Sequence, residues 1–546
     1  MQLTSAAQMR ELDRQTIEEI GLPGMVLMEN AGRATVDLMQ RVFGPVAGRT
    51  VCVFAGPGNN GGDGLVIART VHGLGAFPFI FLLVSPDTLQ GDAARNFAIA
   101  SKLRLPCQVF DQPGKMPALL DTVLTLNRMH PVHCLVDAIF GTGLTRPVEG
   151  HFQDAINCLN SLRTTNSLPV VAVDLPSGLH SDTGAVLGAA VQADLSVTYG
   201  QPKPGHYHHG GPLVGRVERV DIGIPAKLVA RAGLRGSILD HTTADLLDPR
   251  RKDVHKGTNG HLLIVAGSEG KTGAALLCGQ GALRCGTGLV SFVVPRDLNP
   301  VFEAASAETM SIALPASSRW LSVEDYDLIQ AAAEGKHCLV LGPGLGTEPA
   351  TAELVVRLYT ENPLPQVVDA DALNILAAHP EAIRRPAGPR VFTPHPGEMA
   401  RMLGTSVAAV QADRLAAAQW LNDLAAEGLP PLVTVLKGAG TVVASVQGGW
   451  AINTSGNPGM GTGGMGDVLS GVIAGLLAQG YSPWNAACLG VYLHGLAADR
   501  LARTRPYGYT ASEVARMLPE VIGHCTLSTP AQETPCSQPR TSLPVR

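Results

Sequence analysis

The chain has 546 residues, more than one ordinary domain holds, so its length predicts two large domains. Charged residues make up only 16% of the chain and the formal net charge is −5, which gives no sign of nucleic-acid binding. The 62 glycines and 39 prolines, with only 4% aromatic residues, are typical of α/β layers joined by many tight turns.

The cysteines occur singly and no CxxC pair appears, which argues against a zinc or redox site and against a disulfide framework. They are better explained as small buried residues in a reducing compartment. The start of the chain lacks the regions of a signal peptide, and no run of about 18 apolar residues predicts a membrane span. We therefore expect a soluble cytoplasmic protein without a membrane partner.

The first half of the chain alternates between helical and strand-like stretches. Residues 8–42 have a helical pattern interrupted at 21–24, and a further helix is predicted from about residue 65 to residue 74. Strands are predicted at 50–55, 77–84, 133–140 and 169–174. This alternation favours βαβ units and a mostly parallel sheet.

A second α/β series begins near residue 260. Its strands are predicted at 261–266, 289–294, 338–341, 366–369, 391–393 and 432–436. After about residue 526 the chain is rich in Ser, Thr, Pro and Gln, which predicts a disordered tail. The predicted organisation is a first domain over 1–225, a linker over 226–239, a second domain over 240–525 and a tail over 526–546.

A glycine-rich loop, GPGNNGGDG at residues 56–64, follows the first predicted strand. Its Gly-x-Gly-x-x-Gly spacing matches the dinucleotide fingerprint, but Asn59, Asn60 and Asp63 make it more polar than that fingerprint needs. Asp87, the candidate ribose anchor, lies in a Ser-Pro-Asp turn, which disfavours a plain NAD dehydrogenase. The simplest alternative is a tight strand–helix turn that uses glycine for its conformational freedom.

Two further strand ends carry carboxylates, because Asp137 and Asp174 each end a predicted strand. Asn60, Asp137 and Ser177 offer oxygen ligands, which suit a hard cation. Asp174 is a candidate for hydrogen bonding to a polar substrate or for proton transfer, and capping of the next turn is the structural alternative.

Residues 1 to about 225 resemble the NAD(P)H-hydrate epimerase domain. The motifs that carry this resemblance are 27–32, 58–64, 137–146 and 174–178. It implies a Rossmann-like three-layer fold and interconversion of the R and S hydrates of NADH and NADPH. It also implies substrate contacts from Asn59, Asn60, Gly61, Gly62, Asp63, Gly141, Thr142, Gly143, Leu144, Thr145, Arg146, Pro147 and Asp174, and potassium held by Asn60, Asp137 and Ser177.

Epimerisation inverts C6 of the hydrated nicotinamide ring. A route that opens and recloses the C–O bond needs a carboxylate to move the proton, and Asp174 is the candidate.

The second glycine-rich loop, residues 461–467, precedes a long apolar stretch with a helical pattern. No Gly-Lys-Ser/Thr follows, so it is not a Walker A loop. Backbone amides at such a helix start neutralise charge on a transferred phosphoryl group, and Asp467 is placed to take a proton from an attacking hydroxyl. The alternative is a glycine-rich helix start that Asp467 caps.

Other glycine-containing segments also follow strands of the second half. Lys437 starts such a segment and is a candidate phosphate ligand, although a solvated lysine in a β-turn is the alternative. Residues 342–346 and 393–398 should face the same crevice, and His395 lies there between two prolines in a rigid loop.

Residues from about 240 to 525 resemble the ribokinase-like superfamily and, more closely, the ADP-dependent NAD(P)H-hydrate dehydratase. The motifs are 260–267, 271–275, 342–346, 369–374, 393–398, 437–441, 457–467 and 493–497. The resemblance implies a three-layer fold, with Ala274, Gly346, His395 and Asp467 on the hydrate and Lys437, Gly438, Ala439, Gly440, Thr441 and Gly466 on the adenine nucleotide. Mg²⁺ is the expected divalent ion.

The implied reaction phosphorylates the C6 hydroxyl of the S hydrate, with Asp467 as base, and then expels phosphate. ADP becomes AMP and phosphate, although the family also includes ATP users, and the use of ADP follows from resemblance to the bacterial fused form.

Together the two resemblances indicate a bifunctional enzyme that repairs one damaged cofactor, with NADHX, NADPHX and ADP as small-molecule partners and a homo-oligomeric state. A vitamin-precursor or sugar kinase with an accessory domain, and a nucleotide-sensing or protein-binding module, stay as alternatives.

Overall fold

The computed structural model describes residues 1–250, 252–424 and 429–528, so residues 529–546 of the predicted disordered tail lie outside the described residues. The chain divides into two compact units. Unit 1 contains residues 1–238 and 394–454, and unit 2 contains residues 239–393 together with the chain from 455 onward. Each unit is described by itself.

The main sheet of unit 1 is parallel, with strand order β4-β3-β2-β5-β6-β7-β8. Its strands are β2 (Thr50–Ala55), β3 (Phe77–Leu82), β4 (Cys107–Val109), β5 (Val132–Ala138), β6 (Val170–Val173), β7 (Leu195–Tyr199) and β8 (Arg216–Val220). The chain order reverses between β2 and β5. Ligands of open α/β sheets bind beyond the carboxyl ends of the strands at such a switch point.

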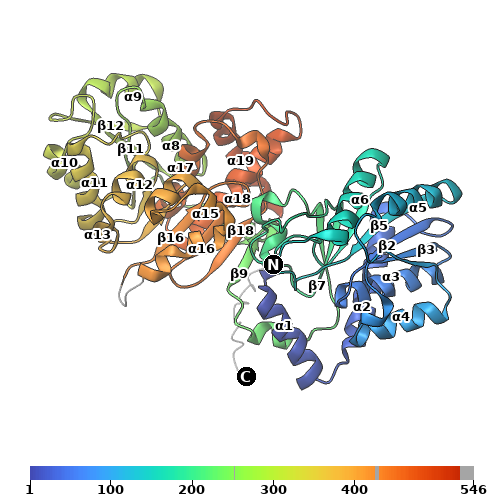
Figure 1. The fold of residues 1–546 in the computed structure, drawn as a ribbon. Coiled ribbons are helices and arrows are strands. Elements are labelled where there is room, and N and C mark those ends of the chain that lie inside the picture. Colours follow the sequence, from blue (N-terminus) through green and yellow to red (C-terminus); the bar gives the residue numbers. More distant parts are fainter. Residues whose placement is uncertain (251, 425–428, 529–546) are drawn as a thin grey trace, which may run out of the picture. The chain divides into compact units, whose positions relative to one another are not determined.

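Helices cover both faces of this sheet (Figure 1). One face packs against α2 (Gly24–Phe43), α3 (Asn59–Gly73) and α4 (Gly91–Lys102), and the other packs against α5 (Met116–Met129) and α6 (Gly150–Asn166). Successive side chains of a strand point to opposite faces, so in β2 Val51 and Val53 join the first core while Cys52 and Phe54 join the second. Burial on both faces explains why these strands are continuously apolar.

A smaller layer completes unit 1. Its strands lie in the order β1-β9-β18-β17-β16, namely β1 (Gln2–Leu3), β9 (Gly236–Leu239), β18 (Trp450–Asn453), β17 (Val442–Ser445) and β16 (Leu432–Leu436). Leu3, Ile238, Met399 and Leu436 share its core. The helices α14 (Pro396–Leu403), α15 (Val407–Ala412) and α16 (Arg414–Ala418) pack against this core. Unit 1 also contains α1 (Ala6–Arg14), which runs into a π-helical turn at Gln15–Glu19, and α7 (Ala226–Arg231).

The predicted linker 226–239 thus holds a helix and a strand, α7 and β9. The two compact units are defined by contacts within the structure and do not test the domain limits along the chain. The limits 1–225 and 240–525 therefore stay a prediction.

Unit 2 contains six parallel strands of an 11-stranded sheet, in the order β15-β14-β13-β10-β11-β12. Its strands are β10 (His261–Val265), β11 (Leu289–Pro295), β12 (Met310–Leu314), β13 (Cys338–Leu341), β14 (Gln366–Val368) and β15 (Arg390–Phe392). Here the chain order reverses between β10 and β13, so the loops after these two strands are neighbours.

Two helices of unit 2 approach each other backbone to backbone: α8 (Thr272–Arg284) and α17 (Met465–Ala478). A Cβ built on Gly471 would lie 1.9 Å from the carbonyl oxygen of Cys278, and one on Gly281 would lie 2.4 Å from that of Val468. Only glycine permits this packing, which fixes the start of α17. The other helices are α9 (Asn299–Ala305), α10 (Tyr326–Ala333), α11 (Pro349–Glu361), α12 (Ala370–Ala377), α13 (Pro380–Ile383), α18 (Pro483–Ala502) and α19 (Ala511–Ser528).

The predicted strands at 50–55, 338–341 and 432–436 are confirmed to the residue. Both glycine-rich loops were predicted too long, because α3 begins at Asn59 and α17 begins at Met465. Strands β1, β4, β7, β8, β9, β12, β17 and β18 were not predicted. The described cysteines are free thiols and most are buried, and no described helix is both long and apolar enough to cross a membrane.

Candidate active sites

The loops that follow β2, β5 and β6 in unit 1 surround a cavity of about 550 Å³. It lies at the switch point of the sheet. The predicted substrate residues that line it are Asn59, Asn60, Asp63, Gly141, Thr142, Gly143, Leu144, Thr145, Arg146 and Asp174. Gly61, Gly62 and Pro147 are not among the lining residues. The cavity therefore gathers residues that the sequence separates by more than a hundred positions.

The N-terminus of α3 faces this cavity through Asn59 and Asn60. Unpaired amides at a helix start attract anions such as phosphate. Gly61 has a packing role, because a Cβ there would lie 2.1 Å from the carbonyl oxygen of Gly56. The side-chain Nδ2 of Asn60 is buried and donates no hydrogen bond to a described residue. This end of α3 thus offers donors to a ligand.

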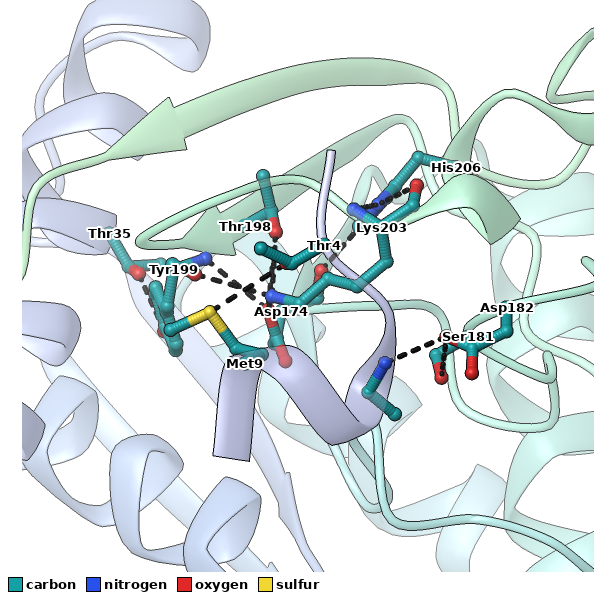
Figure 2. Close-up of polar contacts among 11 residues, drawn as sticks. Thr4, Met9, Thr35, Asp174, Ser181, Asp182, Thr198, Tyr199, Lys203 and His206 are labelled. Atoms are coloured by element: carbon teal, nitrogen blue, oxygen red, sulfur yellow. Dashed lines mark hydrogen bonds and ion pairs between the residues drawn. The ribbon is translucent and has the colours of Figure 1, made fainter. Parts of the chain in front are cut away.

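Asp174 is held by a buried lysine, which Figure 2 shows beside it. Its backbone is left-handed, with φ 63°, a conformation that non-glycine residues rarely adopt and that clusters at functional sites. Nζ of Lys203 donates to Oδ1 of Asp174 at 2.5 Å, and the hydroxyl of Thr198 and the amide of Tyr199 each donate to the same oxygen at 3.2 Å. Nε2 of His206 donates to the Asp174 carbonyl at 2.8 Å.

Burial opposes ionisation of Asp174, but the charge and hydrogen bond of Lys203 outweigh it. The pKa of Asp174 therefore lies below its ordinary value, and the carboxylate is ionised.

Sequence reasoning missed Lys203, Tyr199 and Asp13, which also line the cavity. Burial, and then the charges of Asp174 and Asp13, raise the pKa of Asp63 well above its ordinary value. Burial also raises the pKa of Asp13 to about 6. The only sequence signal for Tyr199 and Lys203 was the polar turn that follows the apolar run at 195–199.

Asp137 and Ser177, predicted as cation ligands, lie in contact. The Ser177 hydroxyl donates to Oδ1 of Asp137 at 2.5 Å and its amide donates to Oδ2 at 2.8 Å. Burial raises the pKa of Asp137 to about 6 despite these bonds, and among the described groups that act on it none is a cation. Oδ1 of Asn60 lies 3.1 Å from the position of a Cβ on Gly141, in the loop that follows Asp137.

Asp467 lies in the first turn of α17 in unit 2 and is half-buried. The residue before this helix, Gly464, has φ 87°, and a Cβ on it would lie 2.6 Å from the Leu277 side chain. Burial, and then the charge of Asp467, raise the pKa of the Cys278 thiol well above its ordinary value. The close packing of α8 and α17 therefore positions Asp467 and Gly466.

Ala274 lies in the first turn of α8, and Gly346 lies in the loop after β13, at the switch point of unit 2. A Cβ on Gly344 would lie 3.2 Å from that of Ala274. The amide of Gly346 donates to Oδ2 of Asp371 at 2.8 Å, and Nζ of Lys271 lies 3.1 Å from the same oxygen. These contacts hold the 342–346 loop against the start of α8.

His395 and residues 437–441 belong to unit 1. The His395 ring caps α14, because its Nδ1 accepts from the amides of Gly397 at 3.0 Å and Glu398 at 3.3 Å. Half of its side chain stays exposed. Nζ of Lys437 lies 3.9 Å from a Glu398 oxygen. His395 therefore caps α14, a structural role that the sequence did not indicate.

A buried arginine, Arg414, holds the loop 437–441 through hydrogen bonds. The sequence did not predict this residue either. Nη2 of Arg414 donates to the carbonyls of Leu436, Lys437 and Gly440 at 3.1, 3.3 and 3.4 Å. Gly438 has φ 136° and Gly440 has φ 64°, so this turn needs glycine at both positions.

Loops at the strand ends meet at two switch points. One switch point carries a carboxylate–lysine pair, and the other carries a glycine-rich helix start. Together they define a two-site α/β enzyme. Residues 262–520 match the family model for NAD(P)H-hydrate dehydratase, and residues 24–205 match that for the YjeF-related protein N-terminus.

The bifunctional NAD(P)H-hydrate repair enzyme Nnr of Moorella thermoacetica is 43% identical over 532 residues, covering 96% of this chain and 97% of that protein. The enzyme of the same name from Escherichia coli is 34% identical, covering 95% and 93%. The ADP/ATP-dependent NAD(P)H-hydrate dehydratase of Bacillus subtilis is 30% identical, covers 53% of this chain and 98% of that chain, and superposes with a TM-score of 0.45. The chain belongs to the family of bifunctional NAD(P)H-hydrate repair enzymes.

Proposed function

We propose that this protein repairs hydrated NADH and NADPH in two steps. It epimerises the R and S hydrates, and it dehydrates the S hydrate to NAD(P)H in a reaction coupled to conversion of ADP to AMP and phosphate. The observation that carries the proposal is similarity to bifunctional relatives over 96% of the chain. Cytoplasmic location and a homo-oligomeric state stay predictions.

The cavity of unit 1 suits the epimerase step. The amides at the start of α3 would bind a phosphate of the dinucleotide, and the ionised Asp174 would accept a proton from the oxygen that bonds to C6. Residues 59–63, 141–147 and Asp174 are the proposed substrate contacts. Gly61, Gly62 and Pro147 stay in this set as predictions.

Asn60, Asp137 and Ser177 are the proposed potassium ligands. The residues fit the ion, because all three offer oxygen and because the buried Asp137 carboxyl has no cation among the groups that act on it. A bound potassium ion would supply charge neutralisation beside the substrate. The residues themselves join the end of β5 to the loop after β6 through the Ser177–Asp137 bonds.

Asp467 is the proposed base of the dehydratase step. It would take the proton of the C6 hydroxyl as that oxygen attacks the terminal phosphoryl group of ADP, while amides at the start of α17, including Gly466, stabilise the developing charge. Ala274, Gly346 and His395 are the proposed hydrate contacts, and Lys437, Gly438, Ala439, Gly440 and Thr441 those of the nucleotide.

Phosphate then leaves as the ring nitrogen supplies its electron pair, which forms a C6=N1 iminium. Loss of a proton from C5 to solvent then forms the C5=C6 double bond, returns the electron pair to N1 and restores the reduced nicotinamide. The described residues hold no cluster of three or more His, Cys, Asp or Glu suited to a metal, which fits a Mg²⁺ ion bound mainly by nucleotide phosphates and water.

The test mixes the protein with NADHX, potassium, Mg²⁺ and either ADP or ATP, and follows the absorbance of the reduced nicotinamide. Asp467→Asn should lower the dehydration rate by about 10²–10⁴-fold, because the base is lost, while R/S interconversion continues. The matched control is Asp327→Asn, an exposed acid in the first turn of α10, which should leave both rates unchanged. No recovery by the wild type with either nucleotide would refute the dehydratase assignment.

A further inference from the structure

Helix α1 forms one wall of the epimerase cavity, through Met9, Arg10 and Asp13. It is firmly attached to the rest of unit 1. The amide of Thr4 donates to the Pro202 carbonyl at 3.0 Å, and the amide of Ala6 donates to Oδ1 of Asp182 at 2.8 Å. Figure 2 shows Met9 on this helix facing the groups around Asp174. The position of α1 relative to the cavity is therefore fixed at its start.

Asp13, one turn after Met9, has the features of a functional carboxyl. Its side chain lines the cavity, yet its Oδ1 is buried and accepts no hydrogen bond from a described residue. Burial raises its pKa to about 6, with a further rise from Asp174 and an opposing effect of Lys203. Asp13 lies before residue 24, where the match to the YjeF-related family model begins.

The carboxyls of Asp13 and Asp174 reach the cavity from different elements, one from α1 and one from the end of β6. Asp174 alone is held by Lys203, whose Nζ lies 2.5 Å from Oδ1. Asp174 is thereby ionised, while Asp13 is more readily protonated. One proton donor and one proton acceptor in one cavity are what inversion through loss and return of water requires.

We infer that Asp13 is a catalytic residue of the epimerase step and works with Asp174 as an acid–base pair across the hydrated nicotinamide ring. The inference rests on the epimerase activity proposed above and deepens it.

In one direction, protonated Asp13 gives its proton to the C6 hydroxyl. The C6–O bond breaks with its electron pair on oxygen, water leaves, and the N1 lone pair forms a C6=N1 iminium. Water then adds to C6 from the opposite face as the π pair returns to N1, and Asp174 accepts the proton of the adding water. Solvent carries that proton back to Asp13, and the reverse direction exchanges the two roles.

The other charged groups that face the cavity do not replace Asp13. Arg10, Asp92 and Arg146 line it, and Lys203 is bound to Asp174. Burial raises the pKa of Asp63 and that of the Tyr199 phenol well above their ordinary values, so both are weaker acids than the same groups in water. His206 is neutral, because burial lowers its pKa to about 4.

The test compares Asp13→Asn with Glu11→Gln, which makes the same charge change on the same helix where the carboxylate is exposed and paired with Arg14. R-hydrate turnover and S-hydrate dehydration are measured for each protein. Asp13→Asn should lower epimerisation by about 10²–10⁴-fold with dehydration unchanged, and Glu11→Gln should lower neither. Unchanged dehydration reports that the Asp13→Asn protein is folded.

The pH profile separates a catalytic role from a structural one. Wild-type epimerisation should fall as pH rises through the pKa of Asp13, about 6, and this limb should be absent in Asp13→Asn. In ¹⁸O-labelled water, each inversion should place solvent oxygen on C6, and unlabelled product would refute the C–O step.

Equal epimerisation rates for Asp13→Asn and wild type, or equal losses in Asp13→Asn and Glu11→Gln, would overturn the assignment of Asp13. If the wild type itself does not interconvert the hydrates, the proposed epimerase function fails instead.

Discussion

At the residue scale, the ion pair of Asp174 and Lys203 lines the cavity that we propose for the epimerase step. The Lys203 side chain is 1% exposed and that of Asp174 is 13% exposed. Desolvating two charges is costly unless the geometry is good and further hydrogen bonds are made. Here Thr198 and the Tyr199 carbonyl accept from the same ammonium at 3.1 and 3.2 Å. The pair is therefore stable as a unit, and loss of either partner leaves a buried charge.

Lys203→Met tests this pair. Because Lys203 is the main influence that lowers the pKa of Asp174 against burial, its removal should raise that pKa, and the acid limb of epimerisation should move to higher pH. The folded protein should also lose about 3–5 kcal/mol of stability near neutral pH. Denaturant unfolding and a pH–rate profile measure the two effects.

The sign of the pH effect on stability follows from the same pair. The wild-type pKa of Asp174 lies below its ordinary value of 3.8, so the stabilisation is present above that value and is lost as pH falls through the lower, folded pKa. The double variant Asp174→Asn/Lys203→Met removes both charges and should recover part of the stability. Equal stability of Lys203→Met and the double variant would contradict the buried-charge explanation.

At the scale of elements, both site helices begin inside glycine-rich segments. A run of glycines predicts a loop, because glycine has low helix propensity. In α3, tertiary packing overrides that preference: a Cβ on Gly64 would lie 2.6 Å from the Ala138 side chain, and one on Gly62 would lie 2.7 Å from Met28 sulfur. The sequence could therefore locate both segments but not the first residue of either helix.

Gly61→Ala should destabilise unit 1, because its Cβ would meet the Gly56 carbonyl at 2.1 Å and neither backbone can move freely. Overpacking of this kind costs about 1–3 kcal/mol. Gly73→Ala, in the last position of the same helix, has nothing within 4 Å of its Cβ and should be neutral or stabilising by up to about 1 kcal/mol. Thermal unfolding followed by circular dichroism compares the two. Similar melting temperatures would show that α3 shifts to accept the methyl group.

The sequence predicted candidate site residues best where these residues lie at the end of a strand or just after it. Asp137 lies at the end of β5, and the 141–146 loop and Asp174 follow β5 and β6. Parallel strands bring their carboxyl ends to one edge. Lys203 lies 29 residues from Asp174 along the chain, and Asp13 belongs to an N-terminal helix with an ordinary amphipathic pattern. No local pattern reports that such distant residues meet.

At the scale of the whole molecule, the proposed proton-transfer groups belong to separate units. Asp174 and Asp13 lie in unit 1, whereas Asp467 lies in the first turn of α17 in unit 2. Each unit contains its own set of parallel strands and its own switch point. A substitution at one carboxylate should therefore leave the chemistry of the other intact.

This separation predicts complementation between two proteins that each lack one of the two activities. With a mixture of R and S hydrates, Mg²⁺ and ADP, Asp174→Asn should convert the S hydrate alone, and Asp467→Asn should restore no reduced cofactor. Mixed together they should recover all of it, because the epimerised hydrate is a small molecule that diffuses from one protein to the other. The absorbance of the reduced nicotinamide measures the recovery, with uncatalysed epimerisation subtracted. A mixture that leaves the R hydrate unconverted would mean that the hydrate produced by one chain does not reach the dehydratase of another.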